Sequence, residues 1–264
     1  MSDLASDPYA SIVELSKAFR NRSVLPSQIM EAQLKRIEVI DQKLGSYQTV
    51  YNDAAIASAK EADAAIASNH RIGPFHGIPF ALKDIFELES QITTCGSREM
   101  LQRVSPTTGT VVRRLLEAGG IVIGKTKTVE CALGGWGTNE QMGTPWNPWD
   151  LNEARVPGGS SSGSGVAVAS GLASCATGSD TGGSVRLPAA FCGLTGLKVS
   201  KACLPTDGIM PLSQTLDTPG PMTRNMADLA FMFSIMQGIN PDDLENDMMT
   251  GNGLFDVQMN IFKG

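Results

Sequence analysis

The sequence predicts a layered α/β protein. Segments with apolar residues at helical spacing alternate with short apolar runs rich in β-branched residues, the pattern of helices packed on a sheet. The 264 residues are 42% hydrophobic and 18% charged, which is enough chain for one sizeable core or two small ones. We therefore expect a globular protein built on a β-sheet.

Helices are expected at the N-terminal side of the chain. Ile12, Leu15 and Phe19 recur at helical spacing, and a second periodic set follows Pro26. An alanine-rich third helix is expected over residues 54–68. These helices are interpreted as scaffold.

A strand-like run over residues 75–86 contains Lys83 beside Asp84. Composition alone favours an ordinary lysine at a strand end, with its ammonium group in water. The functional alternative is a buried amine whose pKa falls on desolvation until it acts as a neutral base.

A nucleotide-binding motif must be considered at residues 119–126, which match G-x-x-x-x-G-K-[ST]. That motif needs a strand before it and a helix after it. Here a helix is expected over 107–118 and a strand over 121–123, so the supposed loop consists of β-branched residues suited to a buried strand. We therefore reject nucleotide binding.

Glycine- and serine-rich stretches at residues 155–165 and 178–188 are the candidate site loops. A flexible linker is the ordinary explanation for such composition, but both stretches are short and bounded by apolar elements. We expect a helix of small residues over 166–173, a buried strand over 173–177, and a further helix with Pro188 in its first turn. Trp136, in the preceding long loop, is a candidate substrate contact.

Composition excludes several classes of partner and cofactor. With 21 basic against 27 acidic residues, a formal charge of −6 and no basic block, neither nucleic acid nor an anionic membrane is expected as a direct partner. Five cysteines and two histidines in no ligand spacing predict neither disulfides, nor a metal, nor a cofactor. No leader or membrane span is apparent, so a cytoplasmic protein is expected.

Two known arrangements of a serine nucleophile are excluded because the sequence lacks the residues that they require. Residues 159–163 spell the G-x-S-x-G elbow around Ser161, but that arrangement needs a later histidine and none follows His76. No serine has a lysine three residues further on, which removes the Ser-x-x-Lys arrangement. A serine nucleophile served by a lysine through a second serine remains.

Five ordered motifs carry a resemblance to a known family. They are residues 77–84, 124–126, 147–150, 157–161 and 180–188. Together they closely resemble the amidase signature family, from the N-terminal helices to about Gly238. The resemblance implies a mixed sheet flanked by helices in one structural domain, with a helical scaffold at 1–70, the catalytic core at 71–240, and the start of a missing C-terminal portion at 241–264.

The resemblance also implies a catalytic set. Lys83 matches the family's lysine, Ser160 its bridging serine and Ser184 its nucleophile, the serines lying 24 positions apart. The oxyanion donors would be the N–H groups of the loop that ends at the nucleophile, and two charged residues would hold its shape. The donors are Thr181, Gly182, Gly183 and Ser184, and the supporting pair is Asp180 and Arg186.

The implied function is hydrolysis of a small-molecule carboxylic amide through a Ser184 acyl-enzyme. Two alternatives stay open: the glutamine-hydrolysing subunit of a tRNA-dependent amidotransferase, and a non-catalytic remnant of the fold. The family usually has glycine where this chain has Ser162, and its pattern runs well beyond Gly264. The amide is not specified, and the oligomeric state is open, with a homodimer as one option.

Overall fold

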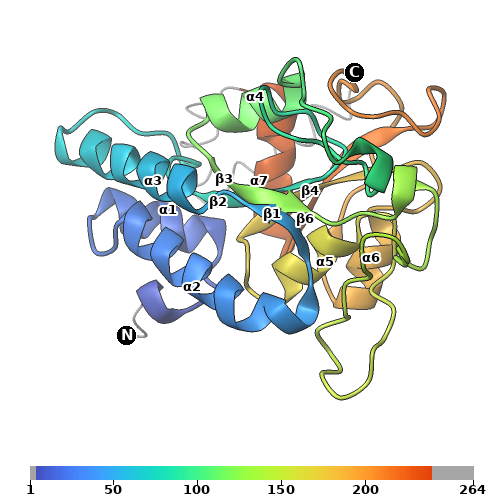
Figure 1. Ribbon diagram of the computed structural model, residues 1–264. Coiled ribbons are helices and arrows are strands. Elements are labelled where there is room, and N and C mark those ends of the chain that lie inside the picture. The colour runs from blue at the N-terminus through green and yellow to red at the C-terminus, as the bar shows by residue number, and fades with distance from the viewer. Residues whose placement is uncertain (1–3, 240–264) are drawn as a thin grey trace.

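The computed structural model describes residues 4–239, in which six strands form one mixed sheet (Figure 1). The spatial order is β1-β3-β2-β4-β6-β5, with β3, β2 and β4 parallel and the outer neighbours antiparallel. The strands are β1 Tyr47–Val50, β2 Pro79–Lys83, β3 Ile121–Thr126, β4 Cys175–Asp180, β5 Thr195–Gly196 and β6 Thr218–Thr223. The sequence prediction of an α/β fold with a mixed sheet is confirmed.

Helices flank this sheet, and their ends carry the expected capping residues. Ser11 and Glu14 form a reciprocal capping box on α1, Pro26 opens α2, and Asn225 caps α7. The helices are α1 Ile12–Arg20, α2 Pro26–Leu44, α3 Asn52–Ala67, α4 Thr110–Glu117, α5 Ser162–Ala169, α6 Arg186–Cys192 and α7 Met226–Gln237. Short 3₁₀ turns lie at Leu4–Ser6, Arg98–Met100 and Glu130–Ala132.

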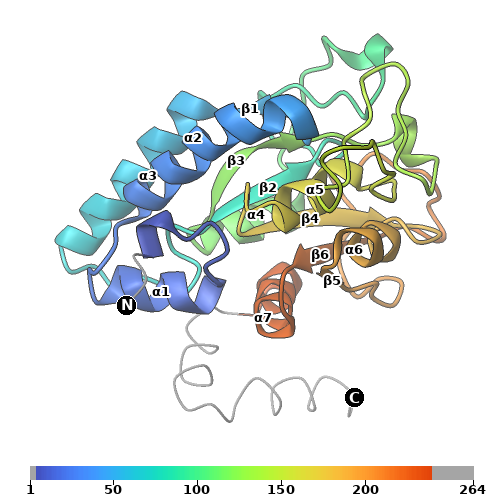
Figure 2. The ribbon, with the colours of Figure 1, turned by 90° about the horizontal axis from the view of Figure 1, so that it is seen from below.

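The sheet has a hydrophobic core on each face. In β2, Phe80 and Leu82 pack in the core that contains α1, α4 and α7, whereas Ala81 packs in the core with α2, α3 and α5. This alternation follows from the two-residue period of a strand. Figure 2 shows α2 and α3 side by side, with the central strands between them and α7. The catalytic candidates therefore leave the ends of strands that are buried on both faces.

The sequence prediction missed three strands, β1, β6 and the two-residue β5, and one helix. The N-terminal segment is not purely helical, because β1 pairs antiparallel with β3. The strand β6 escapes prediction because Pro219 and Pro221 argue against a strand. Pro219 lies opposite Ser179 of β4 and Pro221 lies opposite Thr177, at positions where β6 needs no N–H donor toward β4. The carbonyl of Pro221 points to the opposite edge of β6, where it accepts a hydrogen bond from the N–H of Leu197. The prolines are thus compatible with the pairing. The missed helix is α7.

Residues 121–126 of the G-x-x-x-x-G-K-[ST] match form β3, which follows α4 after a short turn. A helix therefore precedes the motif and a strand occupies it, so these residues do not form a phosphate-binding loop. The predicted continuation at 241–264 lies outside the described residues. Within residues 4–239 no helix is long and apolar enough to cross a membrane.

Candidate active site

Lys83 is the last residue of β2, and its side chain is fully buried. Its Nζ donates to Ser160 Oγ at 2.8 Å and to Ser179 Oγ at 2.8 Å. Its backbone N–H donates to Thr177 Oγ1 at 3.1 Å, which ties β2 to β4 beside the amine. Hydroxyl groups therefore hold both the backbone N–H and the side-chain amine of Lys83.

The surroundings of Lys83 favour the neutral amine. Burial lowers its pKa from 10.5 to about 7, partly opposed by the negative charges of Asp180 and Asp217 and by Cys95. Among residues 4–239 no carboxylate forms an ion pair with Lys83. A lysine in this state can accept a proton near neutral pH.

Ser160 lies just before α5 and follows a cis peptide bond from Gly159. Its carbonyl accepts hydrogen bonds from Val129 N–H at 3.1 Å and from Thr128 Oγ1 at 3.0 Å. A Cβ at residue 159 would lie 2.6 Å from the backbone nitrogen of Gly137, so only glycine permits this approach. The loop thereby presents Ser160 Oγ to Lys83.

Ser161 joins the two serine loops. Its N–H donates to the carbonyl of Ser184 at 3.3 Å, and its Oγ contacts the backbone N and O of Ser179 at 3.3 and 3.4 Å. Ser184 itself is 8% exposed and lies between β4 and α6. No hydrogen bond joins Ser160 Oγ to Ser184 Oγ among the described residues. The contact between the two serine loops is therefore made by Ser161, and not by a hydrogen bond between the hydroxyls of Ser160 and Ser184.

Asp180 organises the turn that carries Ser184. Its Oδ1 accepts from Gly183 N–H at 2.8 Å, and its two oxygens accept from the Arg186 guanidinium at 3.0 Å each. Burial alone would raise the pKa of Asp180, but the hydrogen bonds from Arg186 and from backbone N–H groups outweigh it and hold that pKa below its usual value. The Gly183 N–H is thus engaged within the loop.

Among the described residues, the N–H groups of Thr181, Gly182 and Ser184 donate to no acceptor, which leaves them available to a ligand. The Thr181 hydroxyl donates to Asp217 Oδ1. Asp217, which sequence reasoning missed, also accepts from the N–H groups of Leu212 and Ser213 at 2.8 and 2.9 Å. One end of the nucleophile loop is therefore tied to the turn before β6.

Trp136 is 66% exposed, and its carbonyl accepts from Gly158 N–H at 3.2 Å. The backbone of its loop therefore lies against the Ser160 loop, while the indole is open to solvent. Substrate contact by Trp136 stays a prediction.

A second buried lysine was also missed. Lys125, in β3, donates from Nζ to Thr93 Oγ1 at 2.7 Å and to the Phe86 carbonyl at 2.5 Å, and lies 3.6 Å from Asp84 Oδ1. Burial lowers the pKa of Lys125 and raises that of Asp84, and each charge opposes the shift in the other. Asp84 directly follows β2, and the pairing of β2 with β3 brings it to Lys125, so no local sequence signal indicates the pair.

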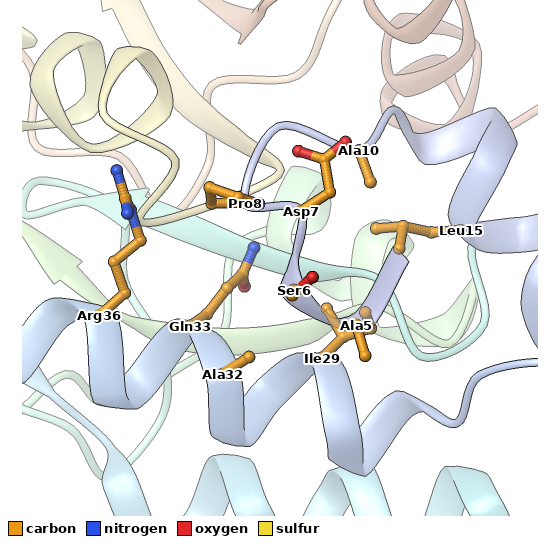
Figure 3. A pocket seen from close by; sticks show the side chains of 10 residues that line it. All are labelled: Ala5, Ser6, Asp7, Pro8, Ala10, Leu15, Ile29, Ala32, Gln33 and Arg36. Carbon is orange, nitrogen blue, oxygen red and sulfur yellow. The ribbon is translucent and has the colours of Figure 1, made fainter. Parts of the chain in front are cut away.

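A separate pocket of about 140 Å³ lies between the N-terminal turn and α2 (Figure 3). Two polar side chains that α2 contributes to it are held by neighbouring segments: Arg36 Nε donates to the Ser170 carbonyl at 2.9 Å, and Gln33 Nε2 donates to Ser174 Oγ at 3.4 Å, whereas Gln33 Oε1 is buried without a partner among the described residues. None of the predicted site residues lines this pocket, so it is a gap in the scaffold and not part of the candidate site. Its lining is Ala5, Ser6, Asp7, Pro8, Ala10, Leu15, Ile29, Ala32, Gln33 and Arg36.

Metal ligands do not gather in the described part of the chain: residues 4–239 hold no group of three or more His, Cys, Asp or Glu side chains that could bind an ion. All five cysteines are free thiols. Three of them are buried, as expected for small hydrophobes, whereas Cys131 is exposed.

Comparison with known proteins gives consistent matches. The model of the amidase family matches residues 28–260. A glutamyl-tRNA(Gln) amidotransferase subunit of Acidothermus cellulolyticus is 38% identical over 243 residues, covering 92% of this chain and 47% of that protein. The same subunit of Dechloromonas aromatica is 42% identical over 235 residues, covering 89% and 48%.

Among solved structures, native peptide amidase from Stenotrophomonas maltophilia superimposes with a TM-score of 0.81 at 36% identity. The match covers 87% of this chain and 48% of the peptide amidase. The chain thus spans about half the length of the proteins it matches.

Proposed function

Since this chain belongs to the amidase family, we propose that it contributes the catalytic groups for cleaving a carboxylic amide C–N bond. The observation that carries the proposal is the 2.8 Å contact between the buried Lys83 Nζ and Ser160 Oγ. It supports a chain of proton transfer from Ser184 through Ser160 to Lys83. Supporting evidence comes from the lowered pKa of Lys83, which makes the amine a base at neutral pH.

In the proposed first half-reaction, Ser160 Oγ passes its proton to neutral Lys83 and takes the proton of Ser184 Oγ, which attacks the amide carbonyl. The negative charge on the carbonyl oxygen is stabilised by N–H groups of Thr181, Gly182 and Ser184. Losing one such donor typically costs about 3–4 kcal/mol in the activation barrier. Gly183, which the sequence predicts for the same role by its position, already donates to Asp180.

The tetrahedral intermediate then collapses as the C–N bond breaks, and the proton returns along the same path to the leaving amine. A water molecule repeats the sequence on the Ser184 ester, releasing the carboxylate and restoring Ser184. The step between Ser160 and Ser184 requires their hydroxyls to approach when substrate binds, and catalytic hydrogen bonds commonly tighten at that stage.

The test is the intact mass of the chain after incubation with a fluorophosphonate. We expect one adduct, mapped by peptide analysis to Ser184, and its loss in Ser184→Ala. Ser200→Ala is the matched control, because Ser200 is an exposed serine outside the site and its removal should leave labelling unchanged. An unlabelled wild-type chain would contradict the proposal and favour a non-catalytic remnant.

A second candidate function follows from the relatives, whose names describe a subunit of glutamyl-tRNA(Gln) amidotransferases. In that case the substrate amide is glutamine, and the released ammonia is used in a reaction that a partner protein carries out. Glutaminase activity that arises only after adding the other subunits of such an enzyme would favour this candidate. Turnover of simple linear amides by the chain alone would favour a free-standing amidase.

A further inference from the structure

Two carboxylates contribute negative charge around Lys83, but their own partners differ. Asp180 forms an ion pair with Arg186 at 3.0 Å, so its charge is largely balanced. Asp217 forms no ion pair among the described residues: its carboxylate accepts only from Thr181 Oγ1 and two backbone N–H groups. The nearby Lys201 ammonium contacts the Asp217 carbonyl at 3.4 Å, not its carboxylate.

A small cavity lies between Asp217 and Ser179, one of the two serines that Lys83 contacts. Ser179, whose hydroxyl accepts from Lys83, lines it together with Thr181 and Asp217. The cavity has a volume of about 10 Å³, room for one water molecule at most. A charge in such a space is screened less than one in bulk water. The remaining walls are mostly apolar side chains, among them Ile85, Ala132, Ile209, Met210 and Leu212.

Resting on the proposed function, we propose that Asp217 is a positioning residue with two effects: it holds the nucleophile loop through Thr181, and its charge acts on protonated Lys83 through the cavity that Asp217 shares with Ser179. The first effect depends on a hydrogen bond, and the second depends on the carboxylate charge. The two are therefore separable by substitution.

The charge effect has a definite sign. Asp180, Asp217 and Cys95 raise the pKa of Lys83 against the larger effect of burial. Asp84, beside Lys83 in sequence, is paired with Lys125 instead. Removing the charge of Asp217 alone makes protonated Lys83 less stable, so its pKa falls and the neutral base persists to lower pH.

Asp217→Asn and Thr181→Val separate the two effects. Asparagine keeps the size of the side chain and can still bond Thr181 and the backbone N–H groups, but carries no charge. Valine removes the hydroxyl and leaves the Asp217 charge in place. The measurement is the rate of fluorophosphonate labelling of Ser184 across pH 5–9, with the melting temperature of each variant as a check on folding.

For Asp217→Asn we expect the pH midpoint of labelling to move down by on the order of half a unit. For Thr181→Val we expect the rate to fall about five- to tenfold at every pH, with the midpoint unchanged. Asp207→Asn is the matched control, because Asp207 also accepts from a threonine, Thr110, but on the surface at the start of α4. Its midpoint and rate should equal those of the wild type.

An unchanged midpoint in Asp217→Asn, or an unchanged rate in Thr181→Val, overturns the corresponding part of the inference. A wild-type chain that is not labelled overturns the proposed function instead. The charge effect is then measured by NMR titration of Lys83 in protein carrying ¹³C at the lysine ε-carbon. A lower Lys83 midpoint in Asp217→Asn supports it, and an equal midpoint overturns it.

Discussion

Lys83 and Lys125 occupy adjacent parallel strands, and both side chains are fully buried, yet they have different neighbours. Within residues 4–239, Lys83 Nζ contacts two serine hydroxyls and no carboxylate. Lys125 Nζ contacts a carbonyl and a hydroxyl and pairs with Asp84. Burial disfavours the ammonium form of both lysines, but in the described part of the chain only Lys125 has a contacting anion to stabilise it.

The contrast separates the proposed base, Lys83, from a structural ion pair, Lys125 with Asp84. Hydroxyl groups can accept a hydrogen bond and can also pass a proton on, which a carbonyl cannot do. Lys83 is therefore suited to proton transfer, whereas Lys125 closes the space between β3 and the loop after β2. Substitutions at the two lysines and at their neighbours test this distinction.

Lys83→Met should give the largest effect. Methionine fills the space of the lysine stem without a base, so the labelling rate of Ser184 should fall about 10²- to 10⁴-fold. Because a poorly solvated amine is removed, the melting temperature should not fall. Near-native labelling in this variant would remove Lys83 from the mechanism, and a large loss of stability would assign it a structural role.

Lys125→Met should act on stability. Asp84 would be left buried without its cation, at a cost of about 3–5 kcal/mol in the free energy of unfolding measured with urea. The double variant with Asp84→Asn removes both charges and should regain most of that loss. If the single variant were as stable as the wild type, the Lys125–Asp84 pair would not be an important support of the fold.

The pH dependence of stability should report Lys83. Its pKa is about 7 in the folded protein and 10.5 in the reference state, so between these values the unfolded chain binds more protons. The wild type should therefore gain stability, relative to Lys83→Met, as pH rises through this window, by up to about 1.4 kcal/mol per unit. Below pH 7 Lys83 is protonated in both states, so the wild type has its lowest free energy of unfolding relative to Lys83→Met. Parallel curves for the two proteins would contradict the lowered pKa.

Ser179→Ala should have the smallest effect. The variant removes one of the two hydroxyl acceptors of Lys83, a contribution of about 0.5–1.5 kcal/mol, so labelling should slow by roughly tenfold or less. Ser164→Ala is a useful comparison, because Ser164 is another buried serine that contacts β4, through the Thr177 carbonyl. Equal labelling rates in the two variants would show that the Ser179 contact has no special part in holding the amine.

The sequence alone narrows the class of catalytic arrangement, and the resemblance to the family then selects Lys83, Ser160 and Ser184 as candidates. The absence of a histidine after His76 excluded the Ser161 elbow and pointed to a lysine base. The apolar residues of 121–123 identified β3 despite the nucleotide-binding spelling around them. Both inferences used local residue chemistry, which a single sequence displays directly.

The contacts that were missed depend on the arrangement of strands. Asp217 bonds Thr181 across 36 positions of chain, and no local pattern predicts that encounter. The Lys125–Asp84 pair can be predicted only from the register of β2 on β3. The strand β6 can be predicted only if it is known which edge of its two prolines faces β4. Tertiary pairing, rather than residue preference, decides all three.

The two ends of the proposed proton path differ in how firmly the backbone is held. Lys83 belongs to the central strand, where its N–H is buried and bonded to Thr177, so exchange of that amide with solvent requires opening of the sheet. Gly182 is exposed on the turn beside the nucleophile. We therefore expect that, on warming, small local openings displace Ser184 relative to the proposed base before the sheet opens. The alignment of the proposed catalytic groups should then be lost before the fold is.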